Sequence, residues 1–149
     1  MSEKQEIYNE CLRLVDEKIN VAKSAMEEAQ HSANQEEKST AGDKYDTARA
    51  QSHIERDLHA RRLAEAVHLK ELLLTLDPTK SHDIVQSGSL VGTSQACYFI
   101  SVGLGKVKAA DREYFVVSPL SPIGQQLLDK KEGDSVNFNR MTFKIERVD

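Results

Sequence analysis

The sequence predicts an α+β protein: an N-terminal antiparallel α-helical coiled-coil hairpin over residues 1–77, a linker over 78–83, and a small antiparallel β domain with one short helix over 84–149. Three observations lead to this prediction. Apolar residues keep a helical spacing through the first half of the chain. The only glycine of that half, Gly42, interrupts the spacing. Beyond Pro78 the pattern changes to short runs rich in β-branched and aromatic residues.

The composition favours two small parts over one large core. Of 149 residues, 39% are hydrophobic and 30% charged, and tryptophan is absent, as expected of an elongated protein with a thin apolar seam. The net charge of -4 gives no overall attraction for nucleic acid, so such a contact would need a local basic patch. The net charge therefore disfavours a function in which the whole chain attracts nucleic acid.

The sequence also indicates a cytoplasmic location. No apolar stretch approaches the roughly 20 residues that span a bilayer, and the start of the chain is polar, without the apolar segment of a signal peptide. Cys11 and Cys97 lie far apart, without metal-ligand spacing, and are expected to be reduced thiols. We therefore expect no cofactor in the free protein and no membrane partner.

The first helix is expected to carry a heptad seam, in which apolar residues alternate at spacings of four and three. The seam consists of Tyr8, Leu12, Val15, Ile19, Ala22, Met26, Ala29 and Ala33. Because these residues become smaller toward position 33, we expect the second helix to approach more closely at that end.

The turn between the helices is predicted at residues 35–42, and Thr40 with Asp43 fits a capping pair for a second helix over about residues 43–76. Most apolar residues of this helix fall on one broad face, namely Ile54, Leu58, Leu69, Leu72, Leu73 and Leu76. Leu63 and Val67 fall on the opposite side. Either the β domain or a partner, including a second copy, could cover that side.

The second half predicts about five antiparallel strands around one short helix. The expected strands are residues 89–91, 96–102, 113–117, 135–138 and 141–145, with turns at 103–105, 110–112 and 139–140. Pro122 stands where the helix would begin, because its missing N–H has no partner in a first turn. Ile123 and Leu127 would form the buried face of this helix, with Leu128 beside them.

Two motifs of this half carry a resemblance to a known family. They are Ser121-Pro122-Ile123-Gly124, followed by Leu127-Leu128, and Gly133-Asp134-Ser135-Val136. Over about residues 84–149 the chain resembles the C-terminal domain of bacterial Gre-type transcript cleavage factors, which has an FKBP-like fold. The other half of that family is an antiparallel coiled coil, which agrees with the heptads found here.

The resemblance implies a transcription elongation regulator that acts on RNA polymerase and is not itself an enzyme. In the family, the β domain docks on the rim of the polymerase secondary channel, here through Ser121, Pro122, Ile123 and Gly124. The coiled coil enters the channel, and acids at its tip help to hold a catalytic magnesium ion of the polymerase, which cleaves backtracked RNA. Magnesium would belong only to that complex, contact with RNA would be indirect, and no small-molecule substrate is implied.

The tip departs from the family pattern. If Tyr45 takes the place of the family tyrosine, the two metal-holding acids fall on Lys38 and Ala41, which cannot bind magnesium. The acids that remain nearby are Glu36, Glu37, Asp43 and Asp46. Asp43 and Asp46 are three residues apart and share a helix face, so they are the first candidates to assist magnesium. Acids chosen for the helix dipole explain them equally simply.

Other interpretations of the chain stay open. Arg49 and Arg56 could contact RNA or the channel lining, or they could belong to a solvated helix surface. A Gre-like channel binder could inhibit or modulate the polymerase without promoting cleavage. An FKBP-like prolyl isomerase or chaperone would need an aromatic-lined pocket, and a structural coiled-coil adaptor would not bind polymerase at all. No nucleophile–base pair or phosphate loop is evident in the sequence.

Overall fold

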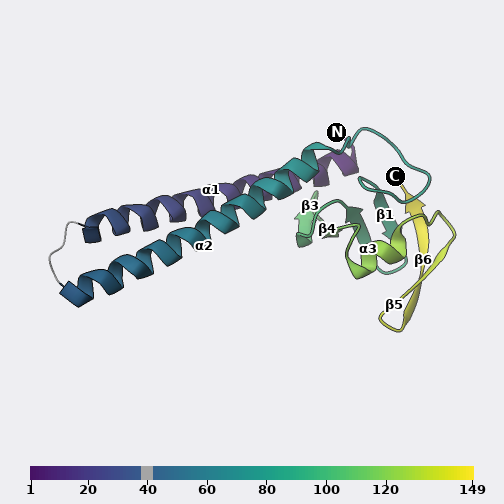
Figure 1. Ribbon diagram of the computed structural model, residues 1–149. Coiled ribbons are helices and arrows are strands. Elements are labelled where there is room, and N and C mark those ends of the chain that lie inside the picture. The colour runs from purple at the N-terminus through teal and green to yellow at the C-terminus, as the bar shows by residue number, and fades with distance from the viewer. Residues whose placement is uncertain (38–41) are drawn as a thin grey trace. The chain divides into compact units, whose positions relative to one another are not determined.

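The chain forms two long helices followed by a six-stranded sheet with one short helix, so the predicted α+β class is confirmed (Figure 1). The computed structural model describes residues 1–37 and 42–149, with the side chains of these except 33, 36–37 and 42–46. The elements are α1 (Glu3–Glu37), α2 (Gly42–Leu74), β1 (Leu90–Thr93), β2 (Cys97–Ile100), β3 (Gly105–Ala109), β4 (Arg112–Val117), α3 (Pro122–Leu127), β5 (Ser135–Phe138) and β6 (Met141–Val148). Within the described ranges, none of the helices has the length and apolarity needed to cross a membrane.

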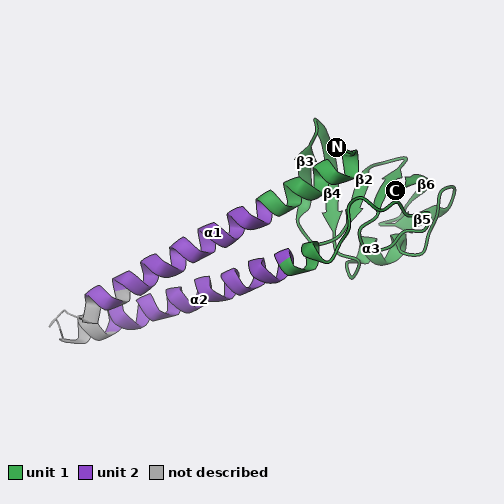
Figure 2. Ribbon diagram, turned by 90° about the horizontal axis from the view of Figure 1, so that it is seen from above, with its two compact units in different colours: residues 1–13, 71–149 green, residues 14–70 purple. Residues whose placement is uncertain are grey.

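The chain divides into two compact units (Figure 2). One unit is a helical hairpin, residues 14–70. The other contains the sheet and combines residues 1–13 with residues 71–149. Both boundaries fall inside helices, because the first turns of α1 and the end of α2 belong to the unit that contains the sheet.

The heptad seam predicted for α1 agrees with the observed burial. Val15, Ala22 and Ala29 are buried, and Ile19 and Met26 are half-buried between them. The side chain of Ala33 lies outside the described residues. Alternating spacings of four and three keep these residues on one stripe of the helix, because this spacing nearly matches the helical repeat.

The apolar face predicted for α2 was wrong in part. Ile54, Leu58 and Leu72 are 61%, 39% and 42% exposed, whereas Leu63, which was placed on the opposite side, is half-buried. The inner line of α2 in the hairpin unit follows a heptad that is largely polar, and it consists of Ser52, Arg56, His59, Leu63, Ala66 and Lys70. Long basic side chains can occupy such positions because their stems cover apolar surface while their charged heads reach water.

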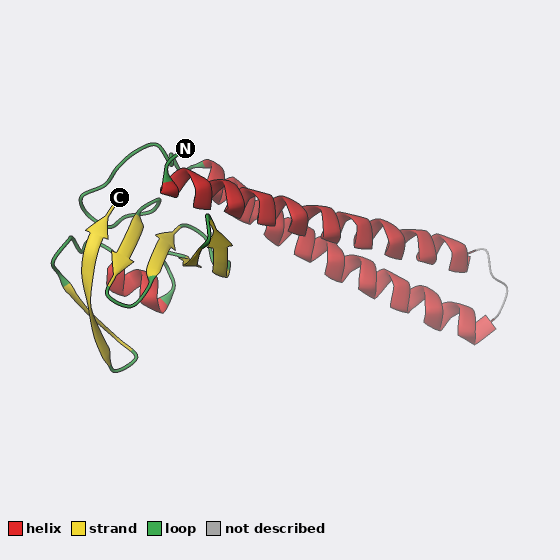
Figure 3. Cartoon of the chain, turned by 180° about the vertical axis from the view of Figure 1, so that it is seen from behind, coloured by secondary structure: helices red, strands yellow, loops and turns green. Residues whose placement is uncertain are grey.

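The sheet is mixed, which corrects the prediction of about five purely antiparallel strands. Its order is β3-β4-β2-β1-β6-β5, and β2 pairs with β4 in parallel while the other neighbours are antiparallel. The strands are the yellow arrows of Figure 3. The additional strand, β3, was missed because it lies between two predicted turns. It is an edge strand in which Val107 is buried between exposed Lys106 and Lys108, so it offers little hydrophobic signal.

One buried cluster of the sheet unit lies on the face that α3 covers. Its buried members are Val85, Val91, Ile100, Leu127, Val136, Phe143 and Ile145. Leu127 is the contribution of α3, and the half-buried Ile123 packs against the same cluster. The predicted start of this helix at Pro122 is confirmed.

Candidate functional site

The motif that suggested polymerase docking forms a tightly capped turn before α3. The Oγ of Ser121 accepts a hydrogen bond from the N–H of Gly124 (3.1 Å) and donates one to the carbonyl oxygen of Ser118 (2.6 Å). Pro122 occupies the first turn, where its missing N–H costs nothing. Gly124 is buried, and a Cβ at this position would collide with the carbonyl oxygen of Ser118. Ser121 and Gly124 are therefore needed to build the turn itself.

The exposed part of this turn is apolar. Pro122 is exposed, and Leu120 is 82% exposed, with its N–H bonded to the Oγ of Ser118 at 3.1 Å. Ile123 faces the sheet and is only half-buried. Sequence reasoning did not select Leu120, because a leucine between two prolines belongs to no helical or strand pattern. Exposed apolar residues that sit on a rigid turn are suited to contact with a partner.

The predicted tip acids cannot be placed at the level of side chains. The backbones of Glu36 and Glu37 belong to the end of α1 and those of Asp43 and Asp46 to the start of α2, but their side chains lie outside the described residues. The capping pair predicted for Thr40 and Asp43 lies there too. Among the residues whose side chains are described, no three His, Cys, Asp or Glu gather in a metal-binding arrangement.

The two predicted channel contacts differ in their surroundings. Arg49 is exposed on α2. Arg56 is half-buried, with its Nη1 atom 3.2 Å from Oδ1 of Asp57, and it lines a hollow of about 280 Å³ together with Met26 and Gln30 of α1. Arg56 therefore takes part in the hairpin interior, whereas Arg49 lies at an exposed position of α2.

A cluster that sequence reasoning missed lies in the sheet unit, around Glu3 of α1. Its carboxylate accepts hydrogen bonds from Arg147 (2.9 Å), from Arg112 (3.2 Å) and from the hydroxyl of Tyr114. Gly92 of the neighbouring strand makes room for this arrangement, because a Cβ there would lie 2.8 Å from Cγ of Arg147. No local pattern could reveal the cluster, since more than 100 residues separate Glu3 from each of its partners.

The charges of this cluster stabilise one another. The hydrogen bond from Arg147 is the main cause that lowers the pKa of Glu3 from 4.5 to about 2, and the bond from Tyr114 and the charge of Arg112 act in the same direction. Burial and the neighbouring carboxylate raise the pKa of Tyr114, and the bond to Glu3 raises the pKa of Arg147. The cluster thus holds the first turn of α1 on β4 and β6 and has the character of a structural anchor.

A second polar network surrounds the segment that precedes β1. The buried ammonium group of Lys4 donates to the carbonyl oxygen of Lys80 at 2.6 Å, and burial lowers its pKa. Nδ1 of His82 lies 2.8 Å from Oγ of Ser89, which also accepts the N–H of Gln86. Although a serine next to a histidine can form a nucleophile–base pair, Ser89 is fully buried. Its role in this geometry is to fix the segment.

No family model matches the chain, and comparisons with curated proteins and with solved structures found no match. The residues and geometry of the chain itself therefore carry the functional argument. They offer two features suited to contact with partners: the apolar turn at Leu120 and Pro122, and the helical hairpin.

Proposed function

We propose that this protein is a transcription elongation regulator that binds at the secondary channel of RNA polymerase. The observation that carries the proposal is the combination of a helical hairpin with a sheet module that bears the Ser121–Gly124 turn. Within the hairpin unit α1 covers residues 14–37 and α2 covers residues 42–70, so the two helical segments are about 36 Å and 44 Å long, lengths that suit insertion into a deep channel. The sheet module, with one helix over its core, would have an FKBP-like fold and would be the docking part.

Docking would use the exposed surface of the capped turn. Leu120 and Pro122 would bury apolar area on the polymerase, while Ser121 and Gly124 hold the turn in shape. A rigid turn loses little conformational entropy when it binds, which favours affinity. Ile123 would contribute indirectly, by fixing α3 on the core.

The docking proposal can be tested with labelled protein and purified RNA polymerase core. Leu120→Glu and Pro122→Glu should each weaken binding at least about tenfold, because a charge would replace a buried apolar contact. An acid in the first helical turn is compatible with the helix dipole, so Pro122→Glu should preserve α3. Ser135→Glu, at an exposed position of β5, is the matched control. Absence of binding by the unaltered protein would refute the function, and unchanged binding by both variants would refute this docking surface.

The effect on transcription would depend on the tip. If Asp43 and Asp46 assist a polymerase magnesium ion, the protein stimulates cleavage of backtracked RNA; otherwise it occupies the channel and modulates the polymerase without cleavage. Asp43→Asn with Asp46→Asn should then abolish stimulation while leaving polymerase affinity unchanged. Glu28→Gln, an exposed position on α1, serves as the control. If the unaltered protein slows elongation and stimulates no cleavage, the inhibitory alternative holds.

One observation favours a second candidate, a prolyl isomerase or chaperone. The ring of Tyr98 lies 5.7 Å from that of Phe115 and 6.4 Å from that of Phe143, measured between centroids, and Phe115 is 37% exposed. The ammonium group of Lys106 lies 5.9 Å from the Phe115 centroid. An aromatic row of this kind could hold a proline ring. Turnover of a proline-containing peptide that Phe115→Ala abolishes would support this activity, and absence of turnover would exclude it.

A further inference from the structure

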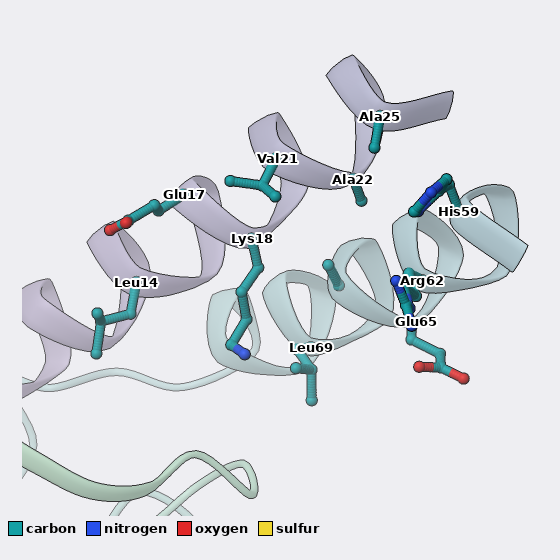
Figure 4. A pocket seen from close by; sticks show the side chains of 11 residues that line it. Leu14, Glu17, Lys18, Val21, Ala22, Ala25, His59, Arg62, Glu65 and Leu69 are labelled. Atoms are coloured by element: carbon teal, nitrogen blue, oxygen red, sulfur yellow. The ribbon is translucent and has the colours of Figure 1, made fainter. Parts of the chain in front are cut away.

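The hairpin unit contains a groove of about 530 Å³ between α1 and α2 (Figure 4). Side chains from both helices line it, and Lys18 projects from α1 toward α2. The apolar part of the lining consists of Leu14, Val21, Ala22, Ala25, Ala66 and Leu69. The groove is therefore largely hydrophobic, although it belongs to a helix pair that is charged over much of its surface.

Two apolar side chains at or beside the groove are left uncovered within the hairpin unit. Val21 of α1 is 64% exposed, and Leu58, one helical turn from the groove residue Arg62 on α2, is 39% exposed. The inner line of α2 is largely polar in this region and includes His59. Burial of such side chains is favourable at about 25 cal/mol per Å² of apolar surface, so a covering surface would gain free energy here.

The charges of the groove indicate what could cover it. Glu17 and Lys18 line it from α1, and Arg62 and Glu65 line it from α2. Each helix thus contributes one acid and one base, so these charges balance although the whole chain carries -4. A nucleic acid or a strongly charged peptide would find no opposite net charge in this groove. A second copy of the same surface would bring complementary charges.

The register of the hairpin places these charges at matching heights. The ion pair of Lys70 with Asp16, at 2.8 Å, aligns the two antiparallel helices. From this pair, Lys18 and Glu65 lie within about 5 Å of each other along the hairpin axis, at a rise of 1.5 Å per residue. If two hairpins face each other across a two-fold axis parallel to their helices, α1 of one copy lies against α2 of the other. Lys18 then meets Glu65 of the second copy, and the reverse pair forms by symmetry.

We propose that the groove is the self-association surface of this protein and that two copies pair through it as an antiparallel four-helix bundle. Val21 and Leu58 would enter the apolar centre of the bundle, and the Lys18–Glu65 pairs would set its register. The groove lining runs over about 17 Å of the hairpin, and two helix diameters give a width of about 20 Å, so the groove offers roughly 340 Å² per copy, less than half of the ~800 Å² of a standard interface. A reversible dimer is expected from an interface of this size.

The proposal is tested by sedimentation velocity of the full chain at concentrations up to about 100 μM. Wild type should form dimers. Lys18→Glu and Glu65→Lys should each weaken dimerisation at least about tenfold, because two like-charge contacts replace two ion pairs. An equimolar mixture of the two variants should restore association, since the heterodimer regains both opposite-charge pairs. Val21→Arg should also dissociate the dimer.

Controls separate self-association from folding. Lys23→Glu reverses an exposed charge outside the groove lining and should leave dimerisation unchanged. Circular dichroism of each variant checks that the helices are retained. A monomeric wild type would overturn the proposal, and so would dimerisation that is insensitive to Lys18→Glu and Val21→Arg. A double variant that carries both Lys18→Glu and Glu65→Lys in one chain completes the test. If this double variant associates and the mixture of single variants does not, the two charges act within a copy and the proposed arrangement is wrong. The measurement uses this protein alone, so its outcome is independent of polymerase binding.

Discussion

Replacement of Glu3 by glutamine tests the anchor that holds the start of α1 on the sheet. The pKa of Glu3 is about 2 instead of 4.5, which corresponds to at most about 3 kcal/mol of favourable interaction with its partners. Arg112 and Arg147 are 63% and 43% exposed, so solvent screening reduces this value, and we expect a loss of about 2 kcal/mol in unfolding free energy. Glu6→Gln is the matched control, because it removes an acid from the same first turn without touching the cluster.

The pH dependence distinguishes this mechanism from a general effect of charge. Because the pKa of Glu3 is lower in the folded state than in the unfolded state, its contribution is complete above about pH 4.5 and disappears as the pH falls toward 2. The difference between wild type and Glu3→Gln should therefore shrink over that interval. Urea denaturation followed by tyrosine fluorescence measures it, since Tyr8, Tyr98 and Tyr114 lie in the sheet unit. Equal stability of the Glu3 and Glu6 variants, or a difference that persists to pH 2, would refute the argument.

Three further predictions concern packing and reactivity. Leu73→Ala should lower the free energy of unfolding by about 3 kcal/mol, because this side chain is fully buried. Leu74→Ala, at a 60% exposed position, should cost less than about 0.5 kcal/mol. Equal losses for the two variants in urea titrations would contradict the burial of Leu73. Burial raises the pKa of Cys11 to about 12, so a thiol reagent should label only the half-buried Cys97 in the native protein and both cysteines after unfolding. Rapid labelling of a native Cys97→Ser variant would show that Cys11 is accessible and reactive, contrary to this prediction. Gly124→Ala should destabilise the sheet unit by at least about 2 kcal/mol in the same titrations, because the new Cβ would collide with the carbonyl oxygen of Ser118. An unchanged urea midpoint would contradict this prediction and show that the turn can relax.

The sequence predicted α1 well because its signal is local. Val15, Ala22 and Ala29 recur at seven-residue spacing and are buried. Ile19 and Met26 lie between them on the same stripe and are half-buried. The start of α3 was equally accessible, since Ser121 and Pro122 have the capping and first-turn chemistry that helix starts require. In both cases the neighbouring residues contain the whole physical reason for the structure.

The sequence failed where the determining contacts are distant or where polar residues lie inside. The inner line of α2 includes Arg56, His59 and Lys70, so a rule that places leucines inside chose Ile54 and Leu58 instead. The parallel pairing of β2 with β4 leaves no local trace either, because strands of this kind pair across an intervening segment. The Glu3 cluster is the extreme case, since its partners are more than 100 residues away.

The candidate site was predictable as a turn but not as a surface. The proline of the Ser-Pro-Ile-Gly motif predicted a helix start at Pro122, and the structure confirms it. Which side chains the turn exposes depends on how α3 lies on the core: Ile123 faces the sheet, while Leu120 and Pro122 face solvent. Only packing separates these roles, so a sequence motif alone assigns docking to residues that mainly hold the backbone.

The apolar line that α1 carries beside its heptad seam connects the two proposals. In the sheet unit this line is buried at Ile7 and Cys11, and in the hairpin unit it continues at the same spacing through Leu14 to Val21, which is 64% exposed, with Lys18 between them. An isolated hairpin gains no stability from an exposed valine in its groove. Residues of this kind are expected where another surface covers the groove. A second copy would cover it in the free protein and would also occupy the hairpin that, under the proposed function, enters the polymerase channel. Dimerisation and channel entry would then compete, and by mass action the apparent polymerase affinity would fall as the protein concentration rises.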